Sequence, residues 1–164
     1  EKKYRPASGH ILGSIIMFLK LGYKLESAEV KNLISYFRNY LIATQINDDA
    51  HDWREDIERG RISTVVAMML EDWKKEYPDV KEINLEKDSE KLQKIFWYGT
   101  MSRACRISLE LSQKSRQSLK EISVFKEISC LERYCNTTES VARQGIDEHE
   151  KSIEFLKAFK RERH

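Results

Sequence analysis

The chain has 164 residues, enough for one domain or for part of a larger one. Its 29 Lys and Arg against 27 Asp and Glu leave a net charge of +2, which argues against a nucleic-acid-binding protein, because such proteins show a clear basic excess. With only 6 Gly and 2 Pro, the chain lacks the turn residues of a many-stranded sandwich or barrel. We therefore predict an all-α fold.

Helical periodicity covers the first half of the chain. The first helix is expected to begin at an N-cap Ser8 and to run to about Lys24. A long second helix is predicted from Ala28 to about Arg59, with Gly60 ending it. A third helix should run from about Ser63 to Tyr77, before Pro78.

The second half continues as helices after a polar loop at 79–87. A fourth helix is expected at roughly 88–121, with Ile95, Tyr98, Ser102, Cys105 and Leu109 on one stripe. One or two further helices are predicted at 123–160, with Asn136 and Glu139 as a capping box for the last. The chain is thus expected to form a single all-α domain, a bundle of five to seven helices.

The most informative segment is acidic and lies at the end of the long second helix. Residues 48–58 hold six carboxylates, namely Asp48, Asp49, Asp52, Glu55, Asp56 and Glu58. Spacings of three and four place Asp48, Asp52 and Glu55 on one helical face, with Asp56 at its edge. Followed backwards, the same face carries Gln45 and then apolar residues, namely Leu41, Phe37 and Leu33. An apolar stripe therefore continues as a carboxylate stripe.

This acidic stripe is unfavourable for an isolated helix. Like charges at i,i+4 cost a few tenths of a kcal/mol per pair, and the C-terminal end of a helix prefers cations by about 0.3–1 kcal/mol per charge. Bound Mg²⁺ would remove both penalties, with Arg54, Arg59 and Arg61 near enough to hold phosphate oxygens. The alternative is a surface helix whose arginines neutralise the acids.

The same segment resembles a known motif. Gln45–Asp52, QINDDAHD, is similar to the second aspartate-rich motif, QxxDDxxD, of the trans-isoprenyl diphosphate synthases (polyprenyl synthetases). Asp52–Arg61 also resembles the DxxED motif and Arg-Gly-Arg turn of the squalene and phytoene synthases. Both families share the class I isoprenoid synthase fold, also called the terpenoid synthase fold, so the resemblance implies an all-α barrel around an apolar pocket.

The resemblance implies a Mg²⁺-dependent transferase acting on a prenyl diphosphate, with the elongating prenyltransferase preferred over squalene-type condensation or cyclisation. It makes Asp48 the first metal ligand, supported by Asp49 and Asp52, whereas in the squalene-type register Asp52 and Asp56 take over that role. Gln45 would face the substrate and, with Asp48, form the catalytic pair. The residues implied to bind diphosphate are Arg59, Arg61 and His10.

The chain departs from the family pattern in two ways. It has no first aspartate motif, so it resembles the C-terminal half of such a synthase and is expected to be an N-terminally incomplete domain that binds weakly and is inactive alone. His10-Ile11 stands where elongating synthases carry Lys-Thr. If Glu1 is the natural first residue, we instead expect a half-barrel remnant that forms a homodimer or binds a partner.

Other readings stay open. The basic end, Lys157–His164, allows a peripheral membrane contact. The three cysteines form no CxxC pair, so they suit a cytoplasmic protein with reduced thiols. His51-Asp52 matches the HD dipeptide of metal-dependent phosphohydrolases, but that class needs further histidine ligands, and His149 is read as a surface residue. The rival from another class is a non-catalytic helical interaction protein whose acidic helix is only surface.

Overall fold

A computed structural model describes residues 8–161 of the chain, with side chains described for 11–156. This part of the protein is all-α, as predicted, and contains no strand. No helix within it is long and apolar enough to cross a membrane. The elements in chain order are α1 (Ser8–Lys20), α2 (Ala28–Glu58), α3 (Thr64–Glu76), α4 (Ser89–Ile95), the π-helical turn η1 (Phe96–Thr100), α5 (Met101–Lys120) and α6 (Ser129–Arg161).

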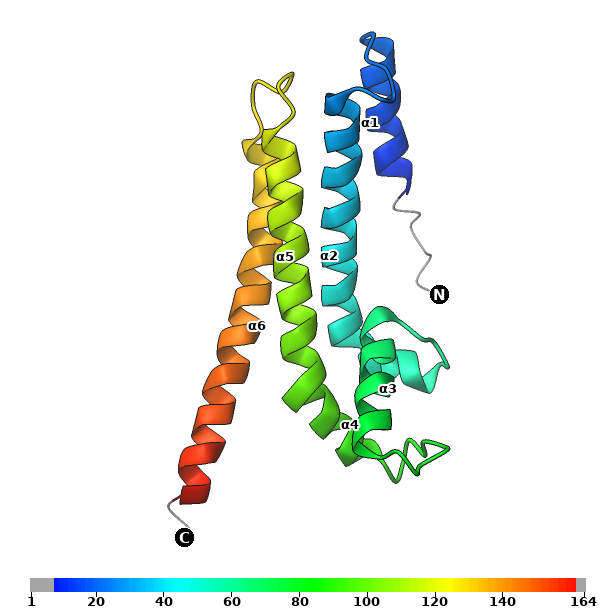
Figure 1. Cartoon of the computed structure of the whole chain (residues 1–164), viewed down its shortest axis with the longest axis vertical. Coiled ribbons are helices and arrows are strands. Elements are labelled where there is room, and N and C mark those ends of the chain that lie inside the picture. The colour runs from blue at the N-terminus through cyan, green and yellow to red at the C-terminus, as the bar shows by residue number, and fades with distance from the viewer. Residues whose placement is uncertain (1–7, 162–164) are drawn as a thin grey trace.

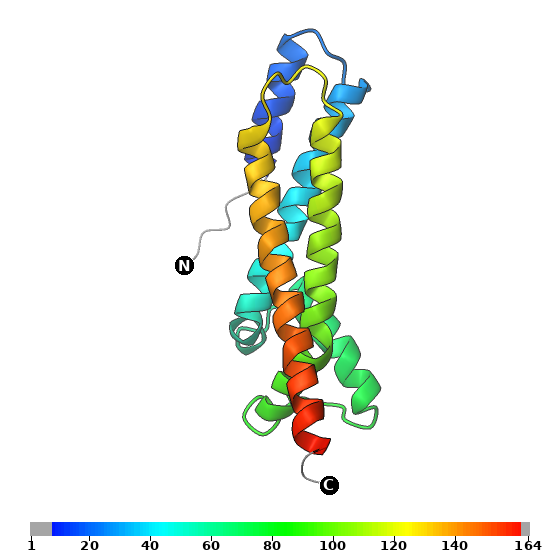
Figure 2. The same cartoon turned by 90° about the vertical axis from the view of Figure 1, so that its left-hand side faces the viewer.

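Three long helices, α2, α5 and α6, run side by side and make the molecule elongated (Figures 1 and 2). Helix α5 packs against both of the others. Its buried face carries small residues, which let the helices approach closely: the Ser108 hydroxyl donates to the Ala43 carbonyl at 3.0 Å, and Ser115 donates to the Tyr36 carbonyl at 2.8 Å. These hydroxyls are therefore buried with their hydrogen bonds satisfied.

Helix α1 covers the upper half of α2 (Figure 1). Its Phe18 is buried in a cluster with Val30 and Leu33 of α2, and Ile15 and Phe37 pack against that cluster. The N-cap Ser27 accepts a hydrogen bond from the Val30 amide, so α2 begins where the sequence predicts. Only the upper part of this face of α2 is covered by α1.

A second core lies at the other end of the molecule, where α3, α4 and η1 pack on the lower halves of α2 and α5 (Figure 1). Trp73 of α3 is almost completely buried there, and Trp53 of α2 stacks on Phe96 with ring centroids 5.2 Å apart. Asp72 accepts a hydrogen bond from Thr100, which ties α3 to the π-helical turn. This core fixes α3 beside the acidic end of α2.

Several sequence predictions are corrected by the structure. Asn136 and Glu139 lie inside one continuous helix, α6, where they bind Arg116 of α5 instead of capping a helix start. The ring nitrogens of His149 are buried, not at the surface. The predicted stripe of the fourth helix is at most partly buried, because the buried face of α5 consists of Ala104, Ser108, Ser112, Ser115 and Leu119.

Gly145 of α6 packs tightly against side chains of α5. A Cβ atom added there would lie 2.7 Å from Sγ of Cys105, closer than packed atoms approach. We therefore expect Gly145→Val to destabilise the fold by about 1–3 kcal/mol through overpacking, measured by urea unfolding. The companion Cys105→Ala/Gly145→Val lacks Sγ and should recover most of that loss, whereas an equal loss in both variants would show that this contact is not the cause.

Candidate functional site

The acidic end of α2 finishes in a turn that fixes the position of Arg61. Gly60 adopts a left-handed φ of 66°, which suits a residue without a Cβ. The Gly60 amide donates to the Ile57 carbonyl at 3.0 Å, and the Arg61 amide donates to the Asp56 carbonyl at 2.7 Å. This pair of bonds is a Schellman motif, so the sequence signal for the helix end at Gly60 is confirmed.

Asp49 ties this turn back onto α2. Its side chain is buried, with Oδ1 accepting from Nε2 of Gln45 at 2.7 Å and Oδ2 accepting from the Thr64 amide at 3.0 Å. Thr64 is the first residue of α3, where unpaired amides favour a negative charge. Ser63, the N-cap, accepts from Val66 in the same turn. Asp49 therefore holds the start of α3 against α2.

Asp48, the neighbour of Asp49, lies on the outward face of α2. The stripe predicted from the sequence begins at Leu33, buried beneath α1, passes the partly buried Phe37, and reaches the exposed Gln45 and Asp48 and the partly buried Asp52. Within the described residues, the Asp48 carboxylate has no hydrogen-bond or ion-pair partner. The carboxylate stripe thus lies beyond the part of α2 that α1 covers (Figure 1).

The two arginines predicted to bind diphosphate lie at the lower end of the same helix. Arg59 forms an ion pair with Glu55, and Nη1 of Arg61 lies 3.9 Å from Oδ1 of Asp56. About half of each arginine side chain is exposed, so both guanidinium groups are accessible. Asp56 is largely buried beside Arg61. The side chain of His10 lies outside the described residues.

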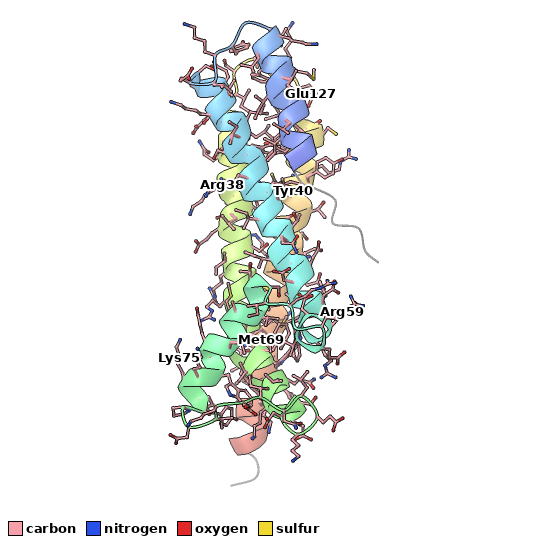
Figure 3. All side chains as sticks on the ribbon, turned by 90° about the vertical axis from the view of Figure 1, so that its right-hand side faces the viewer. Arg38, Tyr40, Arg59, Met69, Lys75 and Glu127 are labelled. Carbon is pink, nitrogen blue, oxygen red and sulfur yellow. The ribbon has the colours of Figure 1, made fainter. Side chains whose placement is uncertain are left out.

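Tyr40 lies about two turns before Asp48 on α2, on the side that faces α6. Its ring stacks on that of Tyr36 at 6.2 Å and approaches Tyr134 of α6 at 5.9 Å. Burial raises the pKa of Tyr40, and the charges of Tyr134 and Asp48 raise it further. Figure 3 labels Tyr40 and Arg59, which lie above and below the acidic stretch. The phenol is therefore neutral and available as a hydrogen-bond donor.

The stripe suits a cation that needs few protein ligands. Asp48 and Asp52 are separated by one helical turn, which places their Cβ atoms about 5–6 Å apart. In the described part of the chain, no three His, Cys, Asp or Glu side chains meet as a metal site. Neither His51 nor His149 therefore completes a histidine-rich centre of the HD type. Mg²⁺ commonly takes only one or two carboxylates, with waters and substrate phosphates as its other ligands.

Asp72 and Asp88, two aspartates outside the acidic stretch of α2, have structural partners. Besides Thr100, Asp72 also binds Arg103, with Oδ1 3.2 Å from Nη1. Asp88 accepts from Lys91 at 2.9 Å, and this bond lowers the pKa of the Asp88 carboxyl. Neither carboxylate belongs to the stripe of α2.

Sequence reasoning missed Thr64 as a partner of Asp49. A signal for it was present, because Ser63 marks a helix start shortly after the turn at Gly60. Sequence spacing does not reveal which of two adjacent aspartates faces that helix start.

Comparisons with protein-family models, curated proteins and solved structures gave no match for this chain.

Proposed function

We propose that α2 carries one half of a Mg²⁺-dependent diphosphate site in a protein of the class I isoprenoid synthase type, acting on prenyl diphosphates. The observation that supports this best is the division of the Asp48-Asp49 pair: Asp49 is buried and holds α3, while Asp48 is exposed and has no described partner. A purely structural acidic helix has no need of Asp48 beside Asp52 on an outward face, where like charges repel.

The site residues divide into two groups. Asp48 and Asp52 are proposed to hold Mg²⁺, which would neutralise the charge of a departing diphosphate. Arg59 and Arg61 are proposed to bind phosphate oxygens by exchanging their present carboxylate partners, Glu55 and Asp56, for the ligand. The elongating register is preferred over the squalene-type register, because it uses Asp48, which has no described partner, where the other uses Asp56, which is paired with Arg61.

Two of the predicted roles change in this proposal. The buried Asp49 acts as a structural residue, since both of its oxygens already accept hydrogen bonds. Gln45 is a positioning residue that holds Asp49 through its amide. A second acidic helix facing α2 would complete the site, and the described residues contain none. The chain alone is therefore expected to bind diphosphate weakly and not to catalyse the reaction. We also propose a cytoplasmic location and a homodimer for this protein.

Calorimetric titration with inorganic diphosphate tests the proposal. We expect binding that requires Mg²⁺ and that weakens roughly tenfold or more in Asp48→Asn, because a directly bound charge is lost. The matched control is Glu58→Gln, which removes an exposed charge near the end of the same helix. An equal loss in the control would indicate general electrostatics, and no Mg²⁺-dependent binding would favour the helical interaction protein.

A further inference from the structure

Helix α1 is apolar on both of its faces. Its inner side packs Ile15 and Phe18 onto α2. Its outer side exposes between 41% and 66% of each of four large apolar side chains, which we call the α1 outer face: Leu12, Ile16, Met17 and Leu19. Leu21 and Leu25, in the turn that follows, are also more than half exposed. A contiguous apolar surface of this kind marks a binding face.

The charge of this segment differs from that of the rest of the chain. Residues 2–25 hold five Lys and Arg and no Asp or Glu, although the whole chain contains 27 acidic residues. With Glu1 included, residues 1–25 have a net charge of +4, and the remaining 24 basic and 26 acidic residues give −2. Lys20 and Lys24 are exposed at the end of α1 and in its turn. The segment that carries the apolar face thus has an excess of positive charge in its sequence, and Lys20 and Lys24 are the part of that excess that the structure describes.

We infer that the α1 outer face docks the protein on an anionic lipid surface. Apolar side chains of an interfacial helix enter the boundary between headgroups and acyl chains, while lysines contact lipid phosphates. Helix α1 lies along the outside of the bundle, so docking needs no unfolding (Figures 1 and 3). A second copy of the chain fits less well, because its own α1 presents the same exposed Lys20 and Lys24, so the two faces would carry charges of the same sign.

Co-sedimentation of the full chain with lipid vesicles tests this inference. We expect binding to vesicles of phosphatidylcholine mixed with phosphatidylglycerol, weaker binding to phosphatidylcholine alone, and a decrease with added salt. Leu12→Ser/Ile16→Ser should weaken binding to the anionic vesicles roughly tenfold or more, since two apolar side chains no longer insert. Its far-UV circular dichroism should match that of the wild type, because both side chains are exposed.

The matched control is Ile62→Ser/Val80→Ser, which removes two exposed apolar side chains outside α1 and should leave vesicle binding unchanged. The inference would be overturned if the wild type did not bind anionic vesicles, or if the two double variants bound equally. It would also be wrong if Leu12→Ser/Ile16→Ser changed only the molecular mass in light scattering, which would identify an interface between copies. None of these results depends on the diphosphate site.

Discussion

Replacing Asp49 with Ala should lower the free energy of unfolding by about 2–4 kcal/mol. The change removes two hydrogen bonds to a buried carboxylate and leaves the Thr64 amide, at the start of α3, without an acceptor. It also removes a negative charge from a helix N-terminus, where that charge is favourable. Urea unfolding followed by far-UV circular dichroism measures this loss.

The adjacent residue supplies the control for that experiment. Asp48→Ala should change the free energy of unfolding by no more than about 0.5 kcal/mol, because the side chain is exposed and has no described partner. Both variants lose one carboxylate from the same turn of α2, so net charge and helix position are matched. Equal losses in the two variants would contradict the distinction between a buried and an outward aspartate.

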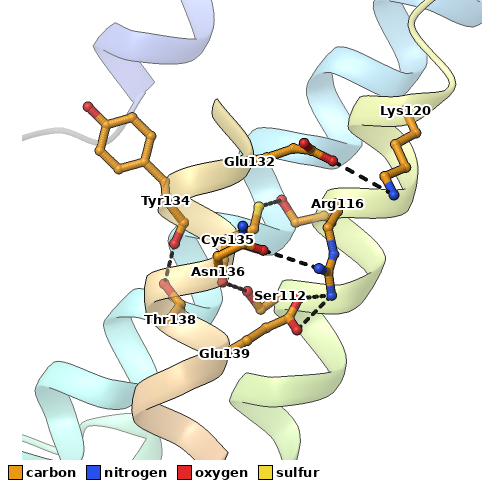
Figure 4. Close-up of polar contacts among 10 residues, drawn as sticks. Ser112, Arg116, Lys120, Glu132, Tyr134, Cys135, Asn136, Thr138 and Glu139 are labelled. Atoms are coloured by element: carbon orange, nitrogen blue, oxygen red, sulfur yellow. Dashed lines mark hydrogen bonds and ion pairs between the residues drawn. The ribbon is translucent and has the colours of Figure 1, made fainter. Parts of the chain in front are cut away.

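Arg116→Ala should cost about 2–3 kcal/mol in the free energy of unfolding. Nη2 of Arg116 lies 2.6 Å from Oε2 of Glu139, and Nη1 lies 3.1 Å from Oδ1 of Asn136 (Figure 4). Only 8% of the Glu139 side chain is exposed, so the variant would leave a nearly buried carboxylate without its cation. The expected cost is below the 3–5 kcal/mol of a fully buried pair, because a third of Arg116 is exposed.

An exposed ion pair between the same two helices provides the comparison for Arg116. Nη2 of Arg106 lies 3.0 Å from Oε1 of Glu150, and more than half of each side chain is exposed. Arg106→Ala should therefore cost at most about 0.5 kcal/mol. Arg116→Ala/Glu139→Leu should recover part of the loss, because an apolar residue tolerates the interface better than an unpaired charge. If Arg116→Ala cost no more than Arg106→Ala, burial would not determine the energy of this pair.

Most helix boundaries of the first half could be predicted because strong local signals set them, although α1 ends at Lys20 and not at the predicted Lys24. Ser27 and Ser63 cap helix starts, and Gly60 ends α2 in the left-handed conformation. The single helix from Ser129 to Arg161 was harder to predict. Asn136 and Glu139 match a capping box by spacing alone, but Arg116, distant in sequence, gives them another partner.

The buried face of α5 could not be predicted from hydrophobic periodicity. Its serines count as polar in any pattern, yet Ser108, Ser112 and Ser115 are buried with their hydroxyls bonded to carbonyls of α2 and α6. The candidate site could likewise be predicted only in part from the sequence. Spacing placed the carboxylates on α2 correctly, but only tertiary contacts with α3 distinguish Asp49 from Asp48.

Urea unfolding with and without Mg²⁺ and inorganic diphosphate tests the central claim, that adjacent aspartates serve structure and ligand separately. With ligand at about 100 times its dissociation constant, the wild type should gain roughly 2.7 kcal/mol. Asp49→Asn should be less stable without ligand yet retain that gain. Asp48→Asn should be as stable as the wild type without ligand and, at the same ligand concentration, lose about half of the gain or more, because its binding is roughly tenfold weaker or worse. A full gain in Asp48→Asn, or no gain in the wild type under any Mg²⁺ concentration, would contradict the account.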